Sequence, residues 1–572
     1  MNEAKRIQPL SILFSIVGLL FFNFRAEVPL FAETTHAEMI LMNGAVYTVD
    51  AKRSWAEAIA ISHGKIVFVG KNSEVGKFKA PRTRVIDLKG KMVLPGFIDS
   101  HVHLLEGGVE TGQCVLNNLK TREEIFRKIR EYAAKHPGKP WIVGGGWELP
   151  IFPGGNPCKE DLDAIIPDRP AVFGAADGHS AWANSKAFQI AGVTEKTPDP
   201  KDGRVERKSG SKEPSGTLRE NAMDMVYEVM PKTTQKEMRQ GLRNGIFLAT
   251  RAAITSVVDA RTDEDYLKVY TRLDRQGELK MNVWASLPVD TEKGPEQIGK
   301  LAELRQKYRT DHFKVTSAKI FADGVIEAHT AALLAPYSDR PGDCGKPILE
   351  APHFNNLAIA LEKAGFQIHV HAIGDRAIRL TLDAIEAARR VSKNQRVLHQ
   401  IVHLELIDPA DIPRFKELGV VADFQALWAF ADPYIKELVE PVLGPERSGR
   451  LYPIGSVLKT GAIVAGGSDW TVSSINPLEA IQVAVTRKDP NNPKEQTWLP
   501  GELIDLPSAI AAYTINGAIL NHQEDRLGSI EPGKSADLVV LSKNIFEIPK
   551  EEIYTAKVLM TIFEGKTVFS TP

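Results

Sequence analysis

The sequence predicts an α/β protein whose centre is a (β/α)8 TIM barrel, with a small β-sandwich built from both termini. The middle of the chain alternates apolar, strand-like runs with helical stretches, whereas both ends are rich in strand and turn patterns. Polar side chains gather where the central runs end, and barrel enzymes carry their active sites at that edge. The eight expected barrel strands cover residues 93–103, 254–260, 281–288, 313–323, 366–371, 396–405, 420–425 and 463–469.

Residues 1–33 are predicted to form a targeting segment. Lys5 and Arg6 precede an apolar run over residues 10–24, and Arg25 follows it. An apolar segment of about 15 residues fits a secretory signal peptide better than a stable membrane span of about 20. We therefore expect an exported protein, periplasmic or secreted, with membrane anchoring through residues 10–24 as the alternative.

The sandwich is expected to combine residues 38–94 with residues 525–572. Asn43-Gly44 separates two β-rich runs near the N-terminus, as hairpin turns do. The first barrel strand (95–109) is separated from the rest of the barrel (241–524) by residues 110–240. Because this stretch is far too long for one crossover, we expect an inserted subdomain that covers the barrel mouth as a lid or faces the substrate.

Composition excludes several classes of function. The formal net charge is -1, from 71 basic and 72 acidic residues, so no general attraction to nucleic acid is expected. Cys114, Cys158 and Cys344 lie far apart and match no zinc-finger spacing. A small-molecule substrate is the expected partner, and homodimer formation is left open.

His101 and His103 end the first predicted barrel strand. Strand side chains alternate between faces, so positions i and i+2 point the same way. Two imidazoles on one face can bind one cation, and neutral imidazole is a good ligand for zinc, iron, nickel or copper. The pair alone is a weak signal, because such pairs also arise on exposed strands.

Other strand ends supply more potential ligands. Lys319 lies at the end of the fourth strand, His369 and His371 at the end of the fifth, His403 at the end of the sixth and Asp469 at the end of the eighth. Such nitrogen and oxygen donors hold catalytic divalent metals. With the first strand, five strands contribute. A closed ring brings them to one point, which favours a barrel over a doubly wound sheet.

Several motifs in order resemble the metal-dependent amidohydrolase superfamily, in particular its YtcJ-like amidohydrolase-3 branch, over residues 38–570. They are PGFIDSHVH, DGHSAWANSKAF, SGTLRE, KIFADG, HVHAIGDRAI, GSDW and GSIEPGKSADLVVL. The resemblance implies one or two divalent ions, zinc being expected. It implies these metal ligands: His101, His103, His371, His403, Asp469 and a carboxylated Lys319 that bridges two ions. Asp469 would also be the catalytic aspartate.

Two of these histidines have a competitor on the same strand. His399 lies four residues before His403, which is favoured because it is nearer the strand end. His369 competes with His371 in the same way. The histidine that does not bind metal is expected to support a ligand or to contact substrate.

Asp469 and Lys319 also have alternatives. Asp469 could cap the segment that follows it. An ordinary ammonium group cannot bind a cation, so Lys319 matters only if it is carboxylated or deprotonated. Otherwise it would form a salt bridge to Asp323 or Asp375, and the site would hold a single ion.

Substrate contacts are expected from His179, His369 and Trp470. His179 lies in the Asp-Gly-His-Ser part of a motif in the inserted segment, where a structural turn histidine is the alternative. His329 stands where sequences of the family often carry arginine, which leaves an anion-binding role at that position in doubt.

The expected activity is hydrolysis of a non-peptide carbon–nitrogen bond in an amide, an N-formyl or N-acyl amine, or a cyclic amide. Asp469 would act as general base and then as general acid, while His371 or His179 steadies the oxyanion. The alternatives are deamination, lactone hydrolysis or decarboxylation on the same scaffold, or an exported protein that binds a ligand without catalysis.

Overall fold

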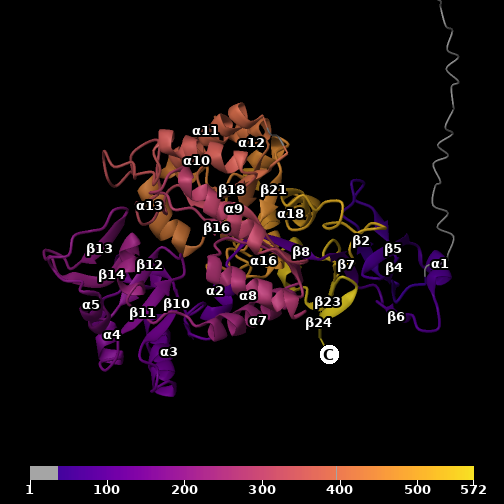
Figure 1. The fold of residues 1–572 in the computed structure, drawn as a ribbon, viewed down its shortest axis with the longest axis horizontal. Coiled ribbons are helices and arrows are strands. Elements are labelled where there is room, and N and C mark those ends of the chain that lie inside the picture. Colours follow the sequence, from indigo (N-terminus) through magenta and orange to yellow (C-terminus); the bar gives the residue numbers. More distant parts are fainter. Residues whose placement is uncertain (1–35, 394–395, 572) are drawn as a thin grey trace, which may run out of the picture. The chain divides into compact units, whose positions relative to one another are not determined.

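A computed structural model describes residues 36–393 and 396–571 (Figure 1). The predicted signal peptide or anchor, residues 1–33, lies outside the described residues. Residues 36–572 form one unit by their internal contacts. Within the described ranges, every helix is too short or too polar to cross a membrane.

Eight parallel strands form the predicted barrel sheet, which confirms the fold class. Each strand pairs in parallel with its neighbour in the sequence. The strands are β8 (Phe97–Val102), β15 (Ile254–Asp259), β16 (Asn282–Pro288), β17 (Phe313–Phe321), β18 (Gln367–Ala372), β19 (His399–His403), β20 (Val420–Phe424) and β21 (Val464–Gly466).

The segment after β21 lies against β8 and brings the last strand back to the first. The backbone N–H of Asp469 donates to the carbonyl of His101 at 2.8 Å, and that of His103 donates to the carbonyl of Trp470 at 3.1 Å. The barrel edge that carries His101 therefore also carries Asp469.

Helices alternate with these strands and cover the barrel (Figure 1). Each has a buried apolar stripe that contributes to the central core. Thr234 and Glu237 form a capping box at the start of α7, and Asp263 caps α8, so local sequence sets where both helices begin. The helices that lie between barrel strands include α7 (Gln235–Arg251), α8 (Glu264–Arg275), α9 (Ile298–Lys307), α10 (Ala351–Lys363), α11 (Asp375–Ser392), α12 (Ile412–Leu418) and α15 (Ile454–Lys459).

The first predicted strand, 93–103, is two strands. β7 (Met92–Pro95) belongs to a terminal sheet, and β8 belongs to the barrel. Gly96 separates them, and a Cβ there would lie 2.3 Å from Thr255 Oγ1. A close approach between neighbouring strands thus requires glycine at the point where the chain passes from one sheet to the other.

Strands from both termini share one sheet, and a second sheet from the N-terminal part packs with them in one core. Leu538 and Val540 of the C-terminal part pair antiparallel with β7, and they pack in the same cluster as Leu41 and Ile59 of the N-terminal part. One sheet has the order β5-β4-β1-β6, and the other has the order β24-β23-β22-β7-β2-β3. Their strands are β1 (Met39–Met42), β2 (Ala45–Tyr47), β3 (Trp55–Ala56), β4 (Ala58–Ser62), β5 (Lys65–Gly70), β6 (Arg84–Asp87), β22 (Leu538–Leu541), β23 (Val558–Phe563) and β24 (Lys566–Ser570).

The inserted segment forms a six-stranded sheet of its own, with α3 (Arg122–Lys135), α4 (Lys159–Ile165) and α5 (Ser185–Ala191) beside it (Figure 1). Trp147, Phe173 and Trp182 are buried in its core. The strand order is β13 (Gly203–Arg207), β14 (Pro214–Glu220), β12 (Ser180–Ala183), β11 (Ala171–Ala175), β10 (Ile142–Trp147) and β9 (Cys114–Val115).

Candidate metal centre

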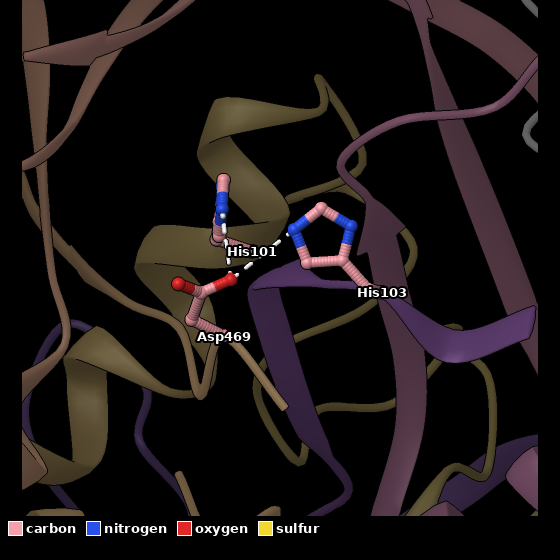
Figure 2. Close-up of side chains that lie close together, drawn as sticks. All are labelled: His101, His103 and Asp469. Carbon is pink, nitrogen blue, oxygen red and sulfur yellow. Dashed lines mark ion pairs between the residues drawn. The ribbon is translucent and has the colours of Figure 1, made fainter. Parts of the chain in front are cut away.

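His101, His103 and Asp469 meet at the barrel mouth. His101 lies in β8, and His103 is the residue just before α2 (Leu104–Glu110). The observed strand therefore ends one residue before His103, whereas the expected strand included it. The Nε2 atoms of the two histidines lie 3.3 and 3.2 Å from the same oxygen, Oδ1 of Asp469. Figure 2 shows the two rings approaching this oxygen from different sides. One potential ligand atom from each residue lies within 4.8 Å of the others.

The Asp469 carboxylate is poised to receive a cation. Burial would raise its pKa, but the neighbouring imidazoles of His101 and His103 outweigh burial and hold the pKa well below its usual range. Oδ1 is buried, and no hydrogen-bond donor reaches it from the described part of the chain. Asp469 has a φ of 50°, and no helix of the described chain begins at the next residue. Asp469 therefore does not cap a helix, and its carboxylate lies against His101 and His103.

Burial favours the neutral, metal-binding form of three histidines here, whereas at His103 the hydrogen bond to Asp469 and the charge of Asp469 outweigh burial and raise the pKa. Burial, followed by the charge of Lys319, lowers the pKa of His101 to about 3. Burial likewise lowers the pKa values of His371 and His403 well below their usual range. Neutral imidazoles around a carboxylate with a free oxygen are a donor set that zinc and similar ions accept, so the residues fit a divalent metal.

His403 extends the centre towards β19. Its Nδ1 lies 4.0 Å from Asp469 Oδ2 and 2.8 Å from Gln425 Oε1, to which it can donate. That contact leaves Nε2 as the nitrogen available to a ligand. The competitor His399 points instead towards Glu362 of α10, at 3.5 Å. The structure thus favours His403 over His399.

His371 lies next to His403, with ring centroids 4.5 Å apart. Its Nε2 lies 3.3 Å from the carbonyl oxygen of Gly324, which leaves Nδ1 for a ligand. Both nitrogens of His369 are engaged, by contrast. Nε2 is 2.7 Å from Nδ1 of His101, and Nδ1 is 2.8 Å from the hydroxyl of Ser286. His369 is fully buried behind His101, so the geometry favours support of a ligand over the expected substrate contact.

Lys319 is buried beside the same cluster. It pairs in register with His369 across the barrel sheet and is 2 % exposed. Burial lowers its pKa to about 7. None of the ion pairs among the described residues includes Lys319. Asp323 instead accepts backbone N–H groups from the loop after β18, and Asp375 accepts that of Leu334, so neither forms the alternative salt bridge.

His179 enters the site from the inserted sheet. Its ring centroid lies 5.2 Å from that of His371, and its Nδ1 donates to Glu220 Oε2 at 2.8 Å. Burial would lower its pKa, but Glu220 and Asp177 outweigh burial and raise it to about 10. His179 is thus an imidazolium beside neutral imidazoles.

Of the remaining predicted contacts, Trp470 lies against α2, where a Cβ on Gly107 would come within 2.7 Å of its ring. Trp428 stacks on His403 at a centroid distance of 5.5 Å and an angle of 7°. His329 pairs with Asp339 at 2.9 Å. The sequence reasoning assigned no role to Glu220 or Gln425, although Glu220 ends the SGTLRE motif.

Comparison with known proteins identifies the family of this chain. The model of a family described as "Amidohydrolase family" matches residues 84–569. The chain is 28% identical to "Putative amidohydrolase YtcJ" of Bacillus subtilis over 92% of this chain and 98% of that protein. It is also 28% identical to "N-substituted formamide deformylase" of Arthrobacter pascens, over 93% and 98% respectively.

A solved structure shares most of this fold. An uncharacterized metal-dependent hydrolase from Pyrococcus furiosus is 27% identical, with a TM-score of 0.68 over 88% of this chain and 99% of that chain. The family expected from the motifs is confirmed. The chain belongs to the amidohydrolase family, in its YtcJ-like branch, and is a hydrolase built around a metal centre.

Proposed function

We propose that this protein hydrolyses the carbon–nitrogen bond of a small amide, an N-formyl or N-acyl amine, or a cyclic amide. The observation that carries the proposal is that Asp469 Oδ1 is buried and lies 3.2–3.3 Å from two imidazole nitrogens, Nε2 of His101 and Nε2 of His103. The similarity to a protein named as an N-substituted formamide deformylase supports N-formyl amines as the first substrates to test.

A divalent ion, zinc in our proposal, would be held by His101, His103, Asp469, His371 and His403. When bound, such an ion lowers the pKa of water and polarises a carbonyl oxygen. Lys319 is proposed to be carboxylated and to hold a second ion. Its burial favours the neutral amine, which is the form that can react with carbon dioxide.

Asp469 is the proposed proton carrier. Its low pKa keeps it as a carboxylate at neutral pH, so it can accept the proton of the attacking water. The water oxygen then forms a bond to the carbonyl carbon. As the carbon–nitrogen bond breaks, Asp469 returns the proton to the leaving nitrogen, which departs as a neutral amine.

His179 or His371 is proposed to act on the substrate oxygen. The carbonyl oxygen gains negative charge when water adds, and an N–H donor aimed at it stabilises that charge. His179 carries a positive charge and has Nε2 free, since Glu220 occupies Nδ1. It therefore suits this role best.

A panel assay tests the proposed function. Protein stripped with a chelator and reloaded with one or two equivalents of zinc in the presence of bicarbonate is offered N-substituted formamides, N-acetyl amines, lactams and lactones, and released amine, or released acid for the lactones, is measured. We expect turnover of at least one amide class after reloading and none in the stripped protein. Hydrolysis of lactones alone, or equal activity with and without metal, would contradict the proposal.

Export is proposed on the sequence of residues 1–33 alone. N-terminal sequencing of the protein from its native host should give a mature chain that begins near residue 33. A chain that keeps residues 10–24 and fractionates with membranes would support the anchor instead.

A further inference from the structure

Glu220 joins the inserted sheet to the barrel at the metal centre. We propose that Glu220 is a positioning residue that holds His179 over His371, so that the inserted subdomain completes the catalytic site. This inference rests on the proposed function. It goes further in assigning a task to the SGTLRE motif and to the insertion itself.

Both carboxylate oxygens of Glu220 are engaged, each by a different part of the molecule. Oε2 accepts from His179 Nδ1 at 2.8 Å, within the insertion. Oε1 accepts from the hydroxyl of Thr330 at 2.7 Å, in the loop that follows barrel strand β17. One side chain therefore fixes the insertion to the barrel at the point where His179 enters the site.

Thr330 is held by the backbone of Val325 beside Glu220. Its Oγ1 accepts the backbone N–H of Val325 at 2.8 Å, and its hydroxyl proton has two acceptors within reach, Glu220 Oε1 at 2.7 Å and the carbonyl of Val325 at 3.2 Å, of which Glu220 is the nearer. Gly324 makes room for this contact. A Cβ at Gly324 would lie 2.2 Å from Thr330 Oγ1 and 2.4 Å from Glu220 Oε1. Only glycine allows the carboxylate and the hydroxyl to approach here.

The same loop positions the imidazoles of both His179 and His371. The carbonyl of Gly324 accepts from His371 Nε2 at 3.3 Å, while Thr330 anchors the carboxylate that holds His179. The 5.2 Å separation of the two rings is thus set from one short segment, residues 324–330. This arrangement ties the orientation of His179 to that of a proposed metal ligand.

The backbone supports the arrangement. Glu220 ends β14, and its N–H donates to the carbonyl of His179 at 3.1 Å. Its φ of 50° lies in the left-handed region, which is strained for a residue other than glycine. The backbone is therefore strained at the residue whose side chain contacts His179.

Glu220→Gln tests the inference, because it keeps the size of the side chain and removes its charge. We expect kcat to fall about tenfold to 100-fold, with KM changed less than about threefold and bound metal unchanged. Glu123→Gln, an exposed glutamate of α3, is the matched control and should behave as wild type. Thr330→Val should reproduce part of the loss, and Thr330→Ser should restore it.

A double-mutant cycle separates positioning from a general structural role. If Glu220 acts through His179, Glu220→Gln should have almost no further effect on kcat in a His179→Asn background. An equal loss in both backgrounds would overturn the inference, as would wild-type kcat in Glu220→Gln.

A second readout does not depend on activity. In protein with 15N-labelled histidine, the His179 signal is assigned by its absence from His179→Asn. Glu220→Gln should shift the Nδ1 resonance of His179, whereas Glu123→Gln should not. If the panel finds no amide substrate but this shift occurs, the proposed function fails while the positioning contact stands. An unchanged resonance would overturn the contact itself.

Discussion

The barrel mouth and the inserted sheet differ in how their buried polar atoms are hydrogen-bonded. At the barrel mouth, Asp469 Oδ1 and His103 Nδ1 are buried without hydrogen-bond partners among the described residues. In the insertion, Arg219 contacts Ser180 and Asn156 as well as the carbonyl of Gly155. Leaving polar atoms unpaired costs free energy unless something outside the chain pairs with them.

This difference indicates that the two regions have different roles. The barrel offers free nitrogen and oxygen atoms to a ligand. In the insertion, the polar groups named above hydrogen-bond to one another and stabilise the sheet. His179 extends its Nε2 towards the proposed substrate position. Variants at the barrel mouth should therefore change metal binding, whereas variants in the insertion should change turnover alone.

The largest effect is expected at the first-strand histidines. His101→Asn or His103→Asn should remove most bound zinc and lower kcat/KM about 10³-fold or more, because each removes a ligand. Elemental analysis after dialysis and the amine-release assay measure the two quantities. His522→Asn, at an exposed histidine, is the control. Full metal content in His101→Asn would show that the free atoms at the barrel mouth serve another purpose.

A smaller effect on turnover is expected from the insertion. His179→Asn should lower kcat about 100-fold, because it removes a charged donor from the substrate oxygen. Bound metal should remain at the wild-type level. Loss of metal in this variant would contradict the separate roles of the two regions, since it would make His179 part of the metal centre.

The sequence predicted the barrel strands and the residues at the barrel mouth well. Each of the eight expected strands overlaps an observed one, because buried parallel strands are continuous apolar runs. His101, His103 and Asp469 were expected together and lie together. The positions of polar residues at strand ends were sufficient for this, since a closed barrel brings strand ends to one edge.

The contacts that cross between domains could not be predicted. The break at Gly96 depends on how closely Thr255 of the next strand approaches. Glu220 is far from both its partners in sequence, and its role appears only when the insertion lies on the loop after β17. The same holds for His369, where spacing left open which histidine of the fifth strand supports the other ligands.

An intermediate effect on metal affinity is expected from the network behind His101. Ser286→Ala removes the hydroxyl beside His369 Nδ1, so His369 should hold the His101 ring less firmly. We expect zinc affinity to fall about tenfold, measured by competition with a chromophoric chelator. Unchanged affinity would mean that the orientation of His101 is set by the backbone of β8 alone.

The smallest effect is expected at His312, outside both regions. Hydrogen bonds to Asp274 and Glu564 raise the pKa of His312 to about 10. Because the unfolded chain releases this proton near pH 6.5, the stabilisation is complete below that pH and is lost as pH rises to about 10.

His312→Asn should therefore destabilise the protein by about 1–2 kcal/mol at pH 6, and by less at pH 9. Urea unfolding of wild type and variant at both pH values measures the difference. A destabilisation that grows with pH would contradict the assigned charge state. Neither metal content nor turnover should change.

The most direct test of the account is the rate of amine release from the best N-substituted formamide by zinc-saturated wild type and Asp469→Asn. The amide cannot carry the proton from water to the leaving nitrogen, so we predict a loss of about 10³-fold or more in kcat, with the fold intact. A variant that keeps kcat within tenfold of wild type at saturating zinc would contradict the central role given to this carboxylate.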